Sequence, residues 1–168
     1  MIYSLFHVLF SIMVPTSAHL MAFSLRLLPL APSKDGGEAE RAHRMEIADA
    51  CVEATADRTE RYICMKIARF ESNYRADVGR CAIRGSVGEV TAWQILPRNS
   101  TEKERLCKSI GEDARLAMER VRESRAACSA LPKAEQLALY ARGSCNSAEG
   151  RRLSKVRWPY DQEVRGLE

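Results

Sequence analysis

The chain has 168 residues, 46% of them hydrophobic, which is enough for one domain of ordinary size with a buried core. Its 26 Lys and Arg residues against 22 Asp and Glu residues leave a formal net charge of only +4, dispersed along the chain. One short basic run, "RRLSKVRW", contains a single aromatic residue and is typical of a solvated helix face, so we expect no nucleic-acid partner.

The N-terminus is strongly apolar, and no Lys, Arg, Asp or Glu occurs from Met1 to Ser24. Such a stretch is long enough for an export signal, with "PTSA" ending at Ala18 as a cleavage site, or for an uncleaved membrane anchor. A wrongly assigned start codon is the third interpretation. We predict an export signal or signal-anchor over 1–31, a linker over 32–40, one domain over 41–160 and a polar tail over 161–168.

Six cysteines follow the linker, and an even number behind an apolar leader favours disulfides in an oxidising compartment. Six cysteines allow 15 pairings, and the sequence does not choose among them. Buried free thiols in a cytosolic helical protein are the alternative. No C-x-x-C motif occurs and no histidine follows His43, so we predict no metal site and no cofactor. We expect an exported protein, periplasmic or extracellular, that contacts a membrane only if its apolar segment stays uncleaved.

The folded part is predicted to be mostly helical. Apolar residues at helical spacing indicate a helix over 39–55, and Asp57 with Glu60 forms a capping box for a second helix that ends near Tyr74. That second helix is predicted to place four residues on one core face: Ile63, Ile67, Phe70 and Tyr74.

Residues 75–97 change character, because their glycines break the helical pattern and "EVTAWQIL" contains short β-prone pieces. We expect a loop or small irregular hairpin there. Further helices are predicted to begin near Thr101 and Ser109, to run over 132–143 with Gly143 as the stop, and to cover 147–158. The predicted fold class is α+β, mostly helical, with a small irregular loop/β region.

Glu71 follows Phe70 and lies four residues after Ile67, at the edge of the predicted buried stripe. A carboxyl group that is partly shielded from water there could hold a proton for donation, as a general acid requires. The alternative is a solvated ion pair with Arg75, four residues further on.

Three short motifs follow in order: Glu71-Ser72 at a helix end, "GSVGEVTAWQILP" over 85–97, and "ALYARG" over 138–143. Together they resemble the soluble lytic transglycosylase domain, a lysozyme-like fold that cleaves peptidoglycan. The resemblance covers roughly residues 47–158. It implies that Glu71 is the catalytic acid and base, and that peptidoglycan glycan strands are the partner of a monomeric enzyme.

The resemblance also implies substrate-binding roles for Ser72, Gln94 and Tyr140. Ser72 would hold the carboxyl group or the substrate, Gln94 would hydrogen-bond a sugar substituent, and Tyr140 would reach toward the acid from the facing helix. Trp93 would stack on a sugar face or belong to the core. The reaction would release 1,6-anhydro products at the β-1,4 bond between MurNAc and GlcNAc.

The chain departs from the family pattern at two of these motifs. "YARG" replaces the usual Tyr-Asn-x-Gly, and the loop before Gln94 is longer and carries Glu89. A second carboxylate with room for a water would permit a muramidase, that is, a lysozyme-type hydrolase. A non-catalytic domain that binds the cell wall or serves a structural role is the other alternative.

Overall fold

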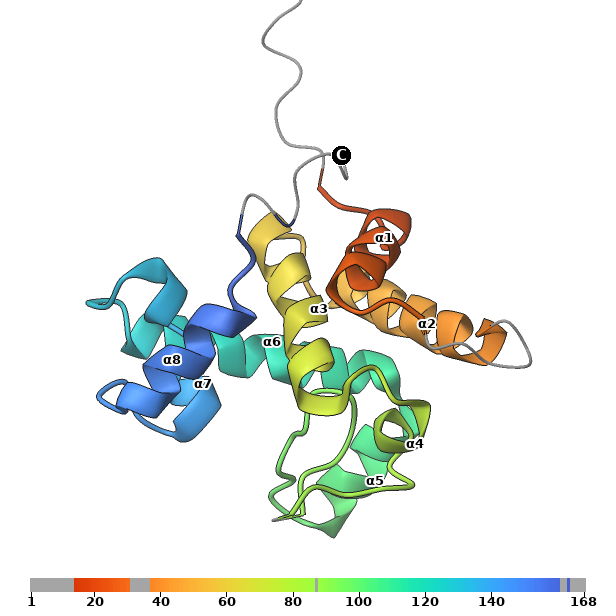
Figure 1. Cartoon of the computed structure of the whole chain (residues 1–168). Helices are drawn as coiled ribbons and strands as arrows, with labels where there is room; N and C mark the ends of the chain where they lie inside the picture. The colour runs from red at the N-terminus through yellow and green to blue at the C-terminus, as the bar shows by residue number, and fades with distance from the viewer. Residues whose placement is uncertain (1–13, 31–36, 87, 161–162, 164–168) are drawn as a thin grey trace, which may run out of the picture.

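A computed structural model describes residues 14–30, 37–86, 88–160 and 163. The described chain is mostly helical, as predicted, and its β structure is one isolated antiparallel bridge between Val90 and Ile95 (Figure 1). Its helices are α1 (Ser17–Leu27), α2 (Glu38–Ala54), α3 (Arg58–Ser72), α4 (Ala76–Gly79), α5 (Ser100–Lys108), α6 (Ile110–Ala127), the 3₁₀ helix η1 (Lys133–Glu135), α7 (Ala138–Arg142) and α8 (Ala148–Arg157).

Helices α3 and α6 cross at the centre of the molecule, with α1 and α2 on one side and α7 and α8 on the other (Figure 1). The capping predicted for α3 is half formed: the Asp57 side chain accepts a hydrogen bond from the Glu60 amide at 2.8 Å. The Glu60 carboxylate instead accepts hydrogen bonds from three other side chains, those of Thr55, Arg122 and Arg125. These bonds stabilise a buried carboxylate between α3 and α6, because a buried charge requires partners.

One residue of the predicted core face of α3 is not in the core. Ile63, Ile67 and Tyr74 are buried, but the Phe70 side chain is 44% exposed. Lys66, one turn before Phe70, is itself buried and binds the Glu163 carboxylate at 2.8 Å. Glu163, which the sequence assigned to a polar tail, therefore binds this part of α3.

The packed part of the chain begins earlier than the predicted domain boundary at residue 41. Leu20 and Phe23 of α1 are fully buried in the same core as α2 and α3. Arg61 donates to the Pro15 carbonyl at 2.7 Å, and the buried Arg44 donates to the carbonyls of Ser24 and Leu28. Residues predicted as part of a leader thus form a helix held at both ends. The predictions for residues 1–13 and for linker residues 31–36 lie outside the described residues.

Residues 75–97 form the irregular region that the sequence predicted, with the short α4 at its start. Two hydrogen bonds of 2.9 and 2.8 Å join Val90 and Ile95, and residues 91–94 form the tight turn between them. The next helix, α5, is capped by Asn99, whose side chain accepts from the Glu102 amide at 2.8 Å, rather than by Thr101 as predicted. The predictions for Ser109 as the cap of α6 and for Gly143 as the stop of α7 are confirmed.

Three disulfides join cysteines that are consecutive in the sequence: Cys51–Cys64, Cys81–Cys107 and Cys128–Cys145. They connect α2 to α3, the loop after α4 to α5, and the end of α6 to the segment between α7 and α8. Disulfides of this number indicate an oxidising, exported environment, as predicted. In the described part of the chain, no helix has both the length and the apolar character needed to cross a membrane.

Candidate active site

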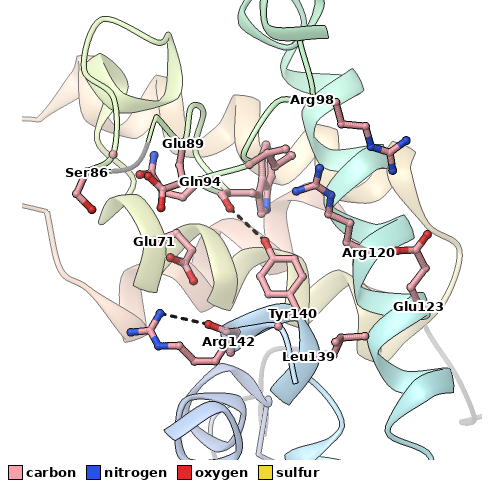
Figure 2. A pocket seen from close by; sticks show the side chains of 15 residues that line it. Glu71, Ser86, Glu89, Gln94, Arg98, Arg120, Glu123, Leu139, Tyr140 and Arg142 are labelled. Carbon is pink, nitrogen blue, oxygen red and sulfur yellow. Dashed lines mark hydrogen bonds between the residues drawn. The ribbon is translucent and has the colours of Figure 1, made fainter. Parts of the chain in front are cut away.

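A pocket lies where the end of α3, the loop over 85–98, α6 and α7 meet (Figure 2). Its walls contain five residues that the sequence analysis singled out for binding or catalysis: Glu71, Glu89, Trp93, Gln94 and Tyr140. These come from three separate stretches of the chain. The fold therefore brings the predicted residues to one place, apart from Ser72.

Glu71 occupies the last turn of α3, and its side chain is 22% exposed. The predicted alternative, an ion pair with Arg75, does not form, because Arg75 binds Asp77 at 2.6 Å. The partner of Glu71 is Arg157 of α8, whose Nε lies 2.9 Å from Oε1 and whose Nη2 donates to the same oxygen. Among the described residues nothing hydrogen-bonds Oε2, which leaves this oxygen available to a ligand.

Gln94 and Glu89 approach each other above Gly85. A Cβ atom added to Gly85 would lie 2.6 Å from the Gln94 Oε1 and 3.0 Å from the Glu89 Cδ, so a larger residue there would displace the flexible ends of both side chains. Gln94 has a positive φ of 48° in the tight turn, and its Nε2 donates to the Thr91 carbonyl at 3.0 Å. The first glycine of the Gly-x-x-Gly motif thus makes room for the polar wall of the pocket.

Tyr140 of α7 reaches across the pocket toward the turn. Its hydroxyl donates to the Trp93 carbonyl at 3.1 Å, which ties α7 to the loop (Figure 2). Burial, followed by the negative charge of Glu71, raises the pKa of Tyr140 above its ordinary value, while the charges of Arg157 and Arg120 act in the opposite direction. The hydroxyl therefore remains a hydrogen-bond donor at the pocket wall throughout the physiological pH range.

Two predicted substrate-binding residues do not have their predicted contacts. The Trp93 side chain is 1% exposed and its indole donates to the Cys64 carbonyl at 3.0 Å, so the core interpretation is correct and its ring has no free face for a sugar. Ser72 is buried and donates to the Ala68 carbonyl at 2.8 Å, one turn back in α3. It neither lines the pocket nor binds the Glu71 carboxylate.

Four further charged residues line the pocket: Arg98, Arg120, Glu123 and Arg142. Of these, only Arg142 had a predicted role, as a polar contact in place of the usual asparagine, with a solvated side chain as the alternative. Arg142 follows Tyr140 by two residues, and its Nη1 donates to the neighbouring Ala141 carbonyl at 3.3 Å (Figure 2). The other three carry no local signal, because charges on an amphipathic helix or after a proline are usually solvated. Arg157 was missed for a similar reason, since it belongs to the basic run interpreted as a solvated face.

Within the described ranges, no three His, Cys, Asp or Glu side chains are grouped so that they could hold a metal ion. Comparisons of the chain with known protein families, with curated proteins and with solved structures found no match.

Proposed function

We propose that this protein is an exported peptidoglycan lytic transglycosylase that acts in the periplasm or outside the cell. The observation that carries the proposal is the shared pocket of Glu71, Gln94 and Tyr140, which come from the three motifs that resemble the soluble lytic transglycosylase domain. They are separated by more than twenty residues at each step, so only the fold can bring them together.

In the proposed reaction, the Glu71 carboxyl group donates a proton to the glycosidic oxygen as the bond from the MurNAc C1 to that oxygen breaks. The carboxylate then takes the proton of the substrate's own 6-hydroxyl group. The oxygen of this hydroxyl forms the new bond to C1, which gives a 1,6-anhydro product without a water molecule. One carboxyl group is therefore sufficient, and Arg157 on Oε1 leaves Oε2 for the proton transfer.

Two other candidate functions are each favoured by one observation. Glu89 lines the same pocket as Glu71, which favours a muramidase in which Glu89 assists a water molecule. The ion pair between Glu71 and Arg157 favours a domain that binds the cell wall without cleaving it, because a guanidinium already occupies one oxygen of the carboxylate.

The test is the digestion of purified peptidoglycan by the wild-type protein and by Glu71→Gln, which cannot donate a carboxylic proton. Glu119→Gln, an exposed position on α6, is the matched control. We expect anhydro-ended fragments from the wild type and the control, and a loss of at least about 100-fold in the variant. Reducing-end products alone would favour the muramidase. Binding without digestion by all three proteins would favour the non-catalytic domain.

A further inference from the structure

The pocket continues past Tyr140 to a pair of arginines. Figure 2 shows Arg98 and Arg120 on the side of Tyr140 that faces away from Glu71, with Glu123 next to them. Arg98 comes from the loop before α5 and Arg120 from the middle of α6. Two elements that are distant from the end of α3 therefore each contribute one arginine to the lining at this end of the pocket, and in Figure 2 the two guanidinium groups point in different directions.

Neither guanidinium is used by the fold as an ion-pair partner. Among the described residues, no carboxylate lies within ion-pair distance of Arg98 or Arg120, and this includes Glu123. Ten of the described arginines do have such a partner; Arg115 of α6, for example, binds Glu112. Positive groups that line a pocket and lack a protein anion are available to an anion from outside.

Arg120 is held in place, and its charge acts on a residue of the candidate active site. The Arg120 Nη2 donates to the Leu96 carbonyl at 3.2 Å, which fixes one guanidinium to the loop that carries Arg98. The charge of Arg120 also acts on the Tyr140 hydroxyl, whose pKa it lowers against the larger effect of burial. A ligand that reaches Arg120 would thus extend along the same pocket as one that touches Tyr140.

We propose that Arg98 and Arg120 form a carboxylate-binding subsite that recognises the stem peptide of the glycan strand. The inference rests on the proposed function, because it is this substrate that carries free carboxylates beside its sugar chain. Guanidinium groups suit the task, since their planar N–H donors match the two oxygens of a carboxylate. The subsite makes the enzyme selective for strands with acidic peptides over neutral strands of the same sugars.

The test uses soluble glycan strands that carry uncrosslinked stem peptides, with the carboxyl groups either free or converted to amides. The variant is Arg98→Gln/Arg120→Gln. The matched control is Arg115→Gln/Arg152→Gln, which removes the same two charges from exposed positions outside the pocket. Dissociation constants are measured in the Glu71→Gln background, so that binding is read without cleavage. Cleavage rates are measured with Glu71 intact.

With the arginines intact, and equally in the control, we expect the dissociation constant for the free-acid strands to be lower than that for the amidated strands by a factor of about ten or more. The double arginine variant should bind both kinds of strand with equal dissociation constants. A preference that survives in the arginine variant overturns the proposal, and so does a wild-type protein that shows no preference or no binding. If no protein cleaves either strand, but the binding preference for free-acid strands is present with Arg98 and Arg120 and absent without them, the transglycosylase proposal is wrong and the carboxylate-binding subsite is supported.

Discussion

Arg157 holds Glu71 across 86 residues of sequence, with two N–H groups of one guanidinium on a single carboxylate oxygen. The Arg157 side chain is 7% exposed and that of Glu71 22%, so the pair is largely shielded from water. It joins the last turn of α3 to the last turn of α8. The contact therefore both positions the candidate acid and ties the C-terminal helix to the centre of the molecule.

The first prediction concerns the stability that this ion pair contributes. Arg157→Ala leaves the largely buried Glu71 carboxylate without a partner, so we expect the free energy of unfolding to fall by about 2 kcal/mol. Urea unfolding followed by circular dichroism measures the change. Arg152→Ala is the control on the same helix, where an exposed pair with Glu149 is removed, and its unfolding curve should match the wild type. Equal curves for all three proteins would contradict the structural role of the pair.

The second prediction concerns Gly85, whose missing side chain makes room for Gln94 and Glu89. Gly85→Ala would push the ends of these two flexible side chains out of position, while the backbone keeps its path. We therefore expect peptidoglycan digestion to fall about tenfold or more with little change in the unfolding midpoint. Gly111→Ala on α6 is the control, because its added Cβ has no neighbour nearer than 3.7 Å. If Gly85→Ala digests peptidoglycan as fast as the wild type, the positions of Gln94 and Glu89 are not important for activity.

The helices were predictable from the sequence because their signals are local. The Asp57 cap, the Ser109 cap and the Gly143 stop each act within one turn, and the structure contains all three. The meeting of Glu71, Gln94 and Tyr140 was predictable only through the resemblance, since no local rule relates three distant segments. Disulfides were predictable as a class, whereas their pairing depends on the fold.

Local sequence patterns did not predict the burial or the partners of residues whose environment depends on tertiary contacts. Phe70 lies at core spacing in α3, but the chain leaves that face uncovered and places the charged Lys66 beside it. The apolar residues of α1 fit an export leader, which stays a prediction, and only packing shows that two of them belong to the core. Arg157 belongs to a basic run that is typical of a solvated helix face, and its partner, Glu71, is 86 residues away in the sequence. Periodicity carries no information about such partners.

The third prediction concerns Asp113, which is 1% exposed in the first turn of α6. Its Oδ1 has no hydrogen-bond partner among the described residues, and burial, followed by the charge of Glu112, raises the pKa of Asp113 to about 9. The ordinary value is 3.8, so between about pH 4 and pH 9 the folded protein keeps a proton that the unfolded chain releases. Stability should therefore fall as the pH rises through this window, by at most about 1.4 kcal/mol per pH unit.

Urea unfolding of the wild type and of Asp113→Asn at pH 5 and pH 8 tests this dependence. We expect the free energy of unfolding of Asp113→Asn to fall much less between pH 5 and pH 8 than that of the wild type, because the amide does not titrate. At pH 8 the variant should be more stable than the wild type. Asp49→Asn, at an exposed position of α2, should keep the wild-type pH dependence. A parallel decline in the wild type and in Asp113→Asn would assign the pH dependence to other groups.

The fourth prediction concerns α1, which the structure places inside the folded unit. Phe23 is fully buried and packs edge-on against Tyr62 of α3, with 4.9 Å between the ring centroids. Phe23→Ala should lower the free energy of unfolding by about 3–5 kcal/mol, because it leaves a cavity between two helices. Leu25→Ala, a partly exposed position on the same helix, should cost less than about 1 kcal/mol.

The same helix allows a direct test of the leader interpretation. Removal of residues 1–31 takes away the carbonyl groups that the buried Arg44 binds, and an unpaired buried guanidinium is strongly destabilising. Cleavage after Ala18 would cut the first turn of α1 and remove its cap, Thr16. We therefore expect the shortened protein to unfold at a clearly lower urea concentration than the full chain. Identical unfolding midpoints would show that α1 can be lost, and would leave export with cleavage as the better interpretation of the N-terminus.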